Sequence, residues 1–438
     1  MFPSECVLER RVRCHGDENL AATDLPLFIL ECEDRKADGY AGDELERCDQ
    51  MLRRMKIGVR LADKPPAVSY LVILGRLDFD AEIEAVNKNV IVVSVDFEGE
   101  LPFSYLIYDA VASSLRMIPS PEDQDPSWIY TFTSSVSLVR PCHGRDYSLV
   151  HMGRLVGEVD SLYLWRPSSS SPPWSEKKKS TFPDLIDWSL NDINTQFSFN
   201  GHAYWVDLRC GVSYCSSDAL FDDNISLVKF GGFIPLPVKV GGHHHRIAEP
   251  VAYRTMGVVR DSYIRFVSID GFQDYVKLKK RTVTVWKLLD HDEGWEEEYK
   301  FSLETLWGFE GFDVPKDLTP MYPLLSTKET DIVYLVLGEY YENPFKRKFL
   351  PSVPRHLLAI DMQNKIVITS VPLEPQDWFL RLVSCGFSRQ LRKALVGPCD
   401  DEGLLIRMKK RRGDGGNVAE THIPMKMKKP RLEKLICC

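Results

Sequence analysis

The sequence predicts an all-β, mainly antiparallel fold whose body is a β-propeller-like arrangement of strand pairs. Three observations predict it. Strand-like runs of β-branched and aromatic residues recur from residue 57 onward, short polar turns separate them, and almost no helical periodicity lies between them. Strand pairs at this density are typical of a propeller, which avoids exposed edges by closing its blades into a ring. A large β-sandwich is the alternative topology.

Composition limits the class of protein. The chain has 438 residues, of which 44% are hydrophobic and 27% charged, a balance typical of a globular protein. Its net charge of −8 argues against nucleic acid as the general partner. The start shows no signal-peptide pattern and no apolar run is long enough to cross a membrane, so we expect a soluble intracellular protein. The 11 cysteines are scattered, and we interpret them as reduced thiols.

Residues 1–56 are interpreted as an N-terminal extension with one short helix. The apolar stretch 25–30 predicts a strand. Over residues 42–56, apolar side chains recur at steps of three and four, with acidic residues early and arginines late. This pattern predicts an amphipathic helix whose charges suit its dipole.

The predicted propeller-like domain spans residues 57–387. Its strands are expected where apolar alternation is bounded by Asp, Gly or Pro. Those expected strands are 57–61, 68–74, 90–95, 105–109, 115–119, 147–152, 162–165, 197–199, 203–207, 263–269, 283–288, 332–337, 357–361 and 365–369. Asn200-Gly201 is the strongest hairpin signal among them, because both turn positions need positive φ.

Three segments and the tail are predicted to lack strands. The serine- and proline-rich segment 167–173, together with Lys177–Lys179, is not expected to form a core strand. Residues 241–245 and 339–354 are predicted loops. Residues 388–438 are predicted to be a disordered basic tail, because apolar periodicity fades there.

No catalytic, cofactor-binding or metal-binding residue is predicted. The chain lacks the spacings of phosphate-binding loops, nucleophile elbows and zinc proteases. Consecutive histidines in an extended chain point to opposite faces, so His243, His244 and His245 are interpreted as a solvated loop rather than a metal site. The Cys-His pairs at residues 14–15 and 142–143 are isolated, and Cys210 with Cys215 lacks the second pair that zinc needs.

Aspartates end several of the expected strands. A catalytic interpretation needs two such carboxylates to converge, whereas the simpler one is that each starts a turn by accepting a backbone hydrogen bond. These residues are Asp96, Asp109, Asp207, Asp270 and Asp361. Tryptophans in strand or turn positions are interpreted as packing residues rather than a ligand cage. They are Trp165, Trp205, Trp286, Trp295 and Trp307.

The tail carries two basic clusters separated by a polar spacer, the pattern of a bipartite nuclear-import signal. The cluster residues are Lys409, Lys410, Arg411, Arg412, Lys426, Lys428, Lys429 and Arg431. A solubilising tail is the alternative. The terminal Cys437-Cys438 is a pattern also found in prenylated small GTPases, but no GTP-binding loop accompanies it here.

Several segments resemble the plant domain-of-unknown-function 1618 (DUF1618) family, which is expanded in grasses. The most specific is Trp205-Val206-Asp207 through Cys215, followed by Phe233-Ile234-Pro235-Leu236-Pro237. Residues 283–307, the strand and proline motif at 59–71 and the Tyr-Asp and Ile-Pro pairs within 108–119 are also similar. The chain departs from the family pattern at Lys64, an insertion, and at Ser216, where the family usually has Asp.

The resemblance covers roughly residues 57–370, with its core at 200–340, and implies a plant origin but no activity, cofactor or site residues. From the architecture we expect a non-enzymatic protein-interaction module, possibly regulatory, in the nucleus or cytoplasm, the basic tail favouring the nucleus. Its partners would be unidentified proteins and a nuclear import receptor, with no membrane and no specific nucleic acid. The alternatives are an enzyme with a loop-built site at a propeller channel, and a nuclear regulator that contacts nucleic acid through its tail.

Overall fold

The computed structural model describes fifteen stretches of the chain. They are residues 5–15, 27–62, 65–75, 79–97, 101–121, 136–141, 146–153, 161–167, 173–174, 176–181, 193–237, 250–271, 277–343, 348–373 and 382–387. All of them lie in one compact unit, Met1–Gly397. The second unit, Pro398–Cys438, falls outside the described residues, and so do the predicted import clusters.

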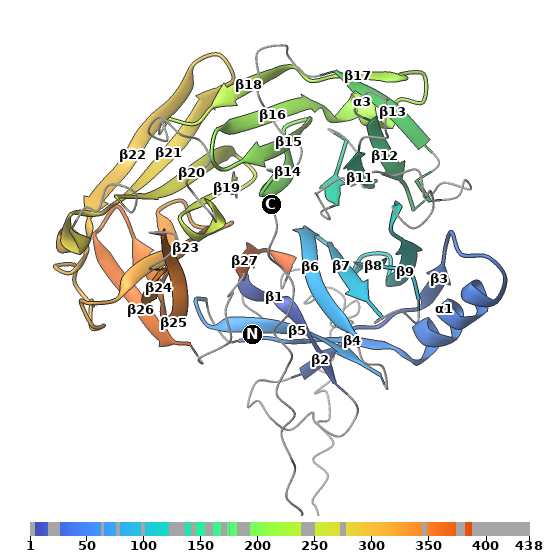
Figure 1. The fold of residues 1–438 in the computed structure, drawn as a ribbon, viewed down its shortest axis with the longest axis horizontal. Helices are drawn as coiled ribbons and strands as arrows, with labels where there is room; N and C mark the ends of the chain where they lie inside the picture. Colours follow the sequence, from blue (N-terminus) through green and yellow to red (C-terminus); the bar gives the residue numbers. More distant parts are fainter. Residues whose placement is uncertain are drawn as a thin grey trace, which may run out of the picture. The chain divides into compact units, whose positions relative to one another are not determined.

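Five sheets of mainly antiparallel strands are formed by the described residues, and one of them has ten strands. That large sheet consists of two groups of strands that meet at a single residue pair, Arg11 and Glu82. These two groups and the other four sheets make six blades, which surround a common centre (Figure 1). The propeller-like all-β fold that the sequence predicts is therefore confirmed.

Blades 1 and 2 share the ten-stranded sheet. Blade 1 is built from β27 (Leu382–Cys385), β1 (Cys6–His15), β5 (Val68–Leu74), β4 (Lys56–Arg60) and β2 (Leu27–Ile29). Blade 2 is built from β6 (Asp80–Asn87), β7 (Val90–Asp96), β8 (Ser104–Asp109), β9 (Ser114–Pro119) and β3 (Asp34–Ala37). Residues before position 57 thus supply three strands of these blades, β1, β2 and β3, as well as the start of β4.

The other four blades follow one another along the chain. Blade 3 is built from β10 (Ser137–Val139), β11 (Ser148–Gly153), β12 (Ser161–Trp165), β13 (Glu176–Thr181) and β17 (Leu227–Lys229). Blade 4 is built from β14 (Thr195–Phe199), β15 (His202–Asp207), β16 (Gly211–Ser216) and β18 (Gly232–Pro235). Blade 5 is built from β19 (Arg254–Val259), β20 (Tyr263–Asp270), β21 (Thr282–Asp290) and β22 (Gly294–Ser302). Blade 6 is built from β23 (Thr319–Leu325), β24 (Ile332–Asn343), β25 (Lys348–Asp361) and β26 (Ile366–Pro372).

Helices are short within the described residues. The predicted amphipathic helix is confirmed as α1 (Gly42–Arg54), which buries Cys48, Met51 and Leu52. The others are α3 (Ser217–Phe221), α4 (Leu303–Leu306) and the 3₁₀ turns η3 (Pro250–Ala252) and η4 (Leu278–Lys280). None of these is long and apolar enough to cross a bilayer.

Successive blades pack face to face, so a strand in the middle of a blade is apolar on both faces. In β7, Ile91, Val93 and Val95 join the core between blades 1 and 2. Val90 and Val92 point the other way and join the core between blades 2 and 3. Full burial of one such side chain stabilises the fold by about 1.5–3 kcal/mol. The same arrangement explains the burial of Trp165 and Trp205, which the sequence interpretation placed in packing positions.

The two ends of the described chain close the ring. The last strand, β27, pairs antiparallel with the first, β1, from Cys6 opposite Cys385 to Glu9 opposite Leu382. Val7 of β1 also belongs to the apolar core that contains the strands of blades 5 and 6. Blade 1 therefore needs both ends of the chain, and it contacts blade 6 through side chains far away in sequence.

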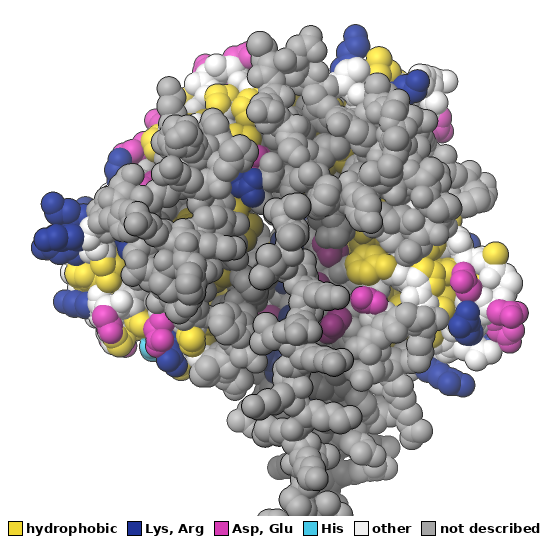
Figure 2. Space-filling view, in the orientation of Figure 1, with side chains coloured by type: hydrophobic (Ala, Val, Ile, Leu, Met, Phe, Trp, Pro, Cys, Tyr) yellow, Lys and Arg dark blue, Asp and Glu magenta, His cyan; other side chains and the backbone are white. Residues whose placement is uncertain are grey.

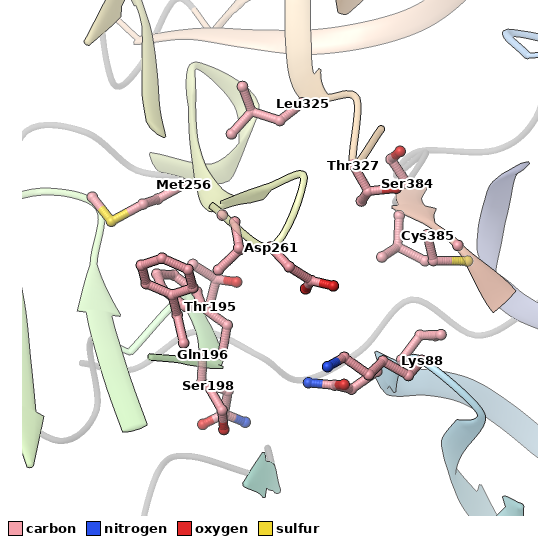
Figure 3. Close-up of a pocket in the computed structure, with 18 of the residues that line it drawn as sticks. Lys88, Thr195, Gln196, Ser198, Met256, Asp261, Leu325, Thr327, Ser384 and Cys385 are labelled. Atoms are coloured by element: carbon pink, nitrogen blue, oxygen red, sulfur yellow. The ribbon is translucent and has the colours of Figure 1, made fainter. Parts of the chain in front are cut away.

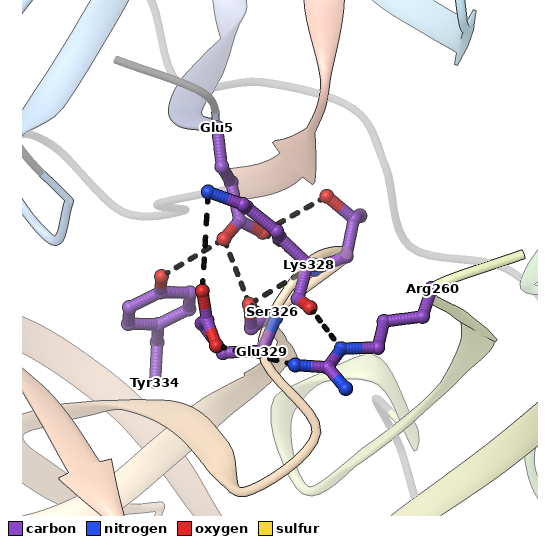
Figure 4. A network of polar contacts seen from close by, with 7 residues as sticks. Glu5, Arg260, Ser326, Lys328, Glu329 and Tyr334 are labelled. Carbon is purple, nitrogen blue, oxygen red and sulfur yellow. Dashed lines mark hydrogen bonds and ion pairs between the residues drawn. The ribbon is translucent and has the colours of Figure 1, made fainter.

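A buried carboxylate reinforces this junction. Glu5 is only 4% exposed and lies beside the turn that joins β23 to β24. Ser326 Oγ donates a hydrogen bond to Glu5 at 2.7 Å, and Tyr334 donates another at 3.3 Å (Figure 4). The backbone N–H and the hydroxyl of Thr327 and the hydroxyl of Ser384 donate to the same carboxylate. Charge-assisted bonds of this kind hold a buried anion in place.

Two predicted loops are strands instead. Lys177–Lys179 lies within β13, which pairs with β12 and β17. Lys178 is buried there because its ammonium donates hydrogen bonds to the carbonyl oxygens of Asp222, at 2.7 Å, and Ile225, at 3.0 Å. Most of the predicted loop 339–354 extends the hairpin of β24 and β25, with Tyr341 opposite Leu350. The apolar and aromatic residues in that segment suit the strand backbone.

We predict that Glu5→Ala lowers the free energy of unfolding by about 3 kcal/mol, because it leaves several buried donors without their acceptor. Urea titration followed by circular dichroism measures the change. The matched control is Glu329→Ala in the neighbouring turn, whose carboxylate lies 3.6 Å from Arg260 and is exposed. An exposed pair of this kind is worth less than about 1 kcal/mol, so equal losses in the two variants would contradict the role of Glu5.

We also predict a pH dependence that originates in blade 3. His151 of β11 is fully buried against Trp174, and burial lowers its pKa to about 4. The native state therefore binds fewer protons than the unfolded chain, so stability falls as pH decreases from about 6.5 to 4, by about 3 kcal/mol in total. His151→Phe should remove this contribution from the difference between the free energies of unfolding measured at pH 7 and at pH 4. An unchanged pH dependence in the variant would refute the assignment.

Candidate functional site

The centre of the ring is a cavity of about 1580 Å³ that receives side chains from all six blades. It is surrounded by the inner strands β6, β10, β14, β19, β23 and β27, each of which contacts the next around the ring. β27 pairs with β1, and β1 meets β6, so the circle of contacts is complete. We call this cavity the central channel.

One end of the channel is formed by the turns that follow these inner strands. Lys88 follows β6, Asn200 follows β14, and Arg260 and Asp261 follow β19. Lys328 lies in the turn after β23. Lys88 and Asp261 project into the same open space from opposite sides (Figure 3). We call this group of turns the channel mouth.

The turns at the mouth hold residues other than glycine in the left-handed region. The φ angles of Lys88, Asn200, Arg260 and Asp261 are 55°, 46°, 56° and 51°. This conformation costs a residue with a Cβ roughly 1–2 kcal/mol. At the confirmed Asn200-Gly201 turn, Gly201 has a φ of 76° and takes the second left-handed position without that cost. Such backbone strain tends to gather at functional sites.

Cations outnumber carboxylates among the described residues that line the channel. The charged side chains in that set are one carboxylate, Asp261, and five cations, which are Arg10, Lys88, Arg140, Arg260 and Lys328. This excess is opposite in sign to the net charge of the chain, −8. On the visible face of the described residues, basic and acidic side chains are interspersed (Figure 2).

Two of these cations are held by their neighbours. Arg140 donates hydrogen bonds to the side-chain oxygens of Asn87, at 3.2 Å, and Asn89, at 3.1 Å. Burial lowers the pKa of Arg140, but an arginine remains charged at any physiological pH. Arg260 donates to the backbone oxygen of Lys328 at 2.7 Å, which ties the blade 5 turn to the blade 6 turn (Figure 4). Hydrogen bonds therefore hold Arg140 at the channel wall and Arg260 at the channel mouth.

The strand-ending aspartates lie elsewhere. Asp109 accepts the backbone N–H of Val111 at 2.8 Å, and Asp207 accepts that of Arg209 at 2.8 Å. Asp361 accepts the N–H of Asn364. The turn-forming interpretation is confirmed for these three residues. Asp270 instead accepts the hydroxyl of Ser268 and lies 4.0 Å from Arg254, and burial raises its pKa. None of these four carboxylates lines the described part of the channel.

A histidine and tyrosine cluster beside blade 4 could not be inferred from the sequence. The ring of His291, in the turn between β21 and β22, lies 2.9 Å from the hydroxyl of Tyr204. The centre of the same ring lies 3.9 Å from that of Tyr214, and the two rings are tilted by 31°. His202 packs edge-on against His291 at 5.2 Å. Burial and the nearby His202 lower the pKa of His291. The cluster joins residues about 90 positions apart, and no local motif marks it.

The described residues contain no group of three or more side chains suited to hold a metal ion. Cys210 donates to Asp207 at 2.9 Å, whereas Cys215 is buried in β16, where burial raises its thiol pKa to about 12. Residues 142–143 and 243–245 lie outside the described residues, as do the side chains of residues 14–15.

We predict that Asp261→Gly raises the free energy of unfolding by roughly 0.5–1 kcal/mol, because glycine relieves the left-handed strain at the mouth. The comparison is Gly201→Ala, which places a Cβ at a φ of 76° and should destabilise the fold by about 1 kcal/mol. Chemical denaturation of both variants tests the pair. A loss of stability in Asp261→Gly would mean that the carboxylate itself stabilises the turn.

Comparison with known proteins finds one family whose model matches part of this chain. Residues 205–334 match the model of the family described as "Protein of unknown function (DUF1618)". This range includes the Trp-Val-Asp block and residues 283–307, whereas the similar segments at 59–71 and 108–119 lie outside it. A comparison with curated protein sequences finds no relative.

Several solved structures are similar at low identity. A member of the DUF4221 family from Bacteroides vulgatus is 8% identical over 67% of this chain and 85% of its own, with a TM-score of 0.32. BamB from Moraxella catarrhalis is 11% identical over 80% and 91%, with a TM-score of 0.31. The dihydro-heme d1 dehydrogenase NirN, in complex with DHE, is 10% identical over 87% and 81%, with a TM-score of 0.29. None of these supplies a function for this chain. Residues 205–334 of this chain are therefore similar to the DUF1618 family.

Proposed function

We propose that the chain is a non-enzymatic protein-interaction module, regulatory in a plant cell, whose channel mouth receives an acidic segment of a partner protein. The observation that carries this proposal is the excess of cations around the channel in a chain of net charge −8. Complementary charge guides a partner to one place and disfavours others.

The form of the mouth supports the same proposal. Turns from several blades converge there, and each follows a strand that is hydrogen-bonded into its sheet, so the backbone that presents the charges is held in place. Binding residues often lie on loops that a rigid scaffold positions. Lys88 is exposed and extends into the channel, where a carboxylate of an extended peptide could reach it (Figure 3). A preorganised site of this kind loses little conformational entropy on binding.

An enzyme with a site at the channel is the alternative. It would need carboxylates and a histidine to converge there with shifted pKa values. The only carboxylate among the described lining residues is Asp261, and no described lining residue is a histidine. The described residues therefore favour binding over acid–base chemistry.

The basic tail supports a second partner, a nuclear import receptor, through the clusters at Lys409–Arg412 and Lys426–Arg431. On this basis the protein would work in the nucleus, with the cytoplasm as the alternative. Contacts of the tail with nucleic acid would be non-specific and would weaken as salt is raised.

We predict that Lys88→Glu weakens binding of a fluorescein-labelled peptide of glutamate and serine by about fivefold, or ~1 kcal/mol, because it reverses a charge inside the mouth. Fluorescence anisotropy with the full chain measures the affinity. Lys316→Glu is the matched control, because Lys316 is exposed and does not line the channel. Any binding of the acidic peptide to the basic tail is the same in every variant, so it does not affect the comparison.

Equal affinities for the unaltered chain and the Lys88→Glu variant would contradict the proposed mouth. Equal losses in the Lys88→Glu and Lys316→Glu variants would show that only overall charge matters. Proteins captured from plant extract support the proposal only if the Lys316→Glu variant retains them and the Lys88→Glu variant does not.

A further inference from the structure

Two cysteines face each other where the ring closes. Cys6 begins β1 and Cys385 ends β27, and the two residues are directly opposite in the antiparallel pair. Their sulfur atoms are 3.7 Å apart, and both side chains are buried. The thiol of Cys6 also lies 3.8 Å from the backbone oxygen of Cys385. In sequence, 379 positions separate them.

The backbone geometry is compatible with a covalent bond. Residues opposite each other in an antiparallel pair have Cα atoms about 4.5 or 5.5 Å apart, depending on the type of pair. Both values fall inside the range of about 4.4–6.8 Å that disulfides require. The sulfur atoms must approach from 3.7 Å to about 2.05 Å, which small rotations of the two side chains can supply without moving the strands.

Cys385 is among the residues that line the channel (Figure 3). The residue is only 5% exposed, so the test uses hydrogen peroxide, which is one of the smallest oxidants. Other described cysteines lie in different settings: Cys48 is buried within α1 and Cys215 within β16.

We propose that Cys6 and Cys385 are a redox pair that peroxide converts into a disulfide, which covalently joins the first and last strands of the ring. One thiolate attacks hydrogen peroxide, the O–O bond breaks, and a sulfenic acid and, after proton transfer, water form. The second thiol then displaces the hydroxyl group as a second water, and the S–S bond forms as the S–O bond breaks. In sum, two thiols and one peroxide give one disulfide and two waters, and the two sulfurs supply the two electrons.

The surroundings of the pair make this reaction slow at neutral pH. The hydrogen bond from Cys6 and burial raise the pKa of the Cys385 thiol well above its usual value, so little thiolate is present. The rate should therefore increase with pH. The pair is stable to weak oxidation and responds only to a sustained peroxide load.

The disulfide changes how easily the first and last strands of the ring can separate. In the reduced chain, β27 is held by backbone pairing and by the contacts of Glu5, so it can separate from β1 when the ring opens. In the oxidised chain that separation is blocked. A crosslink between positions so far apart in sequence restricts the unfolded chain strongly, which stabilises the closed ring.

The test uses the full-length native chain, treated with hydrogen peroxide and then alkylated. Digestion without reductant followed by mass spectrometry should show the Cys6 and Cys385 peptides linked, two hydrogens lighter than their sum. The unfolding midpoint should rise by roughly 3–6 °C and return to its first value after dithiothreitol. Cys48→Ser should retain both results, whereas Cys385→Ser should lose both.

The comparison of oxidised with reduced unaltered chain does not depend on any variant folding. The proposal is overturned if native chain that is oxidised at other cysteines shows no link between residues 6 and 385. It is also overturned if the link appears only when the chain is unfolded in urea before oxidation.

Discussion

The pairing of β1 with β27 is the interaction on which the rest of the structure depends. Each blade packs against its two neighbours, so a row of blades would leave two apolar faces uncovered at its ends. Blade 1 contains both β1 and β27, so the row of blades closes into a ring in which those two faces are covered. The buried Glu5 then fixes blade 1 to the turn of blade 6 with hydrogen bonds from both sides of the junction.

The properties of the centre follow from that closure. Because strand faces are used for packing between blades, polar and charged residues remain at the turns and along the inner edge. Closing the ring brings the turns of different blades together, and their cations then share one cavity. The same closure places Cys6 opposite Cys385, which is one of the residues that line that cavity. Charge and backbone strain therefore meet at the centre, with Cys385 in its wall, although these residues are not neighbours in sequence.

The sequence predicts the local parts of this structure well. The apolar run that became β7, the Asn200-Gly201 turn and helix α1 each carry their own signal within about ten residues. The long-range parts carry no such signal. β27 is four residues long, Glu5 resembles any surface carboxylate, and Lys178 is buried only because carbonyl oxygens from another segment accept its hydrogen bonds. The channel mouth could not be predicted either, since its cations come from separate blades.

Amide hydrogen exchange in β27 of the full chain tests the closure most directly. If β1 and β27 hold the ring together, the β27 amides that are hydrogen-bonded to β1 should exchange as slowly as those of β7 in blade 2, because both open only when the whole ring unfolds. Exchange of residues 382–385 at the rate of an unstructured chain, while β7 stays protected, would contradict the account.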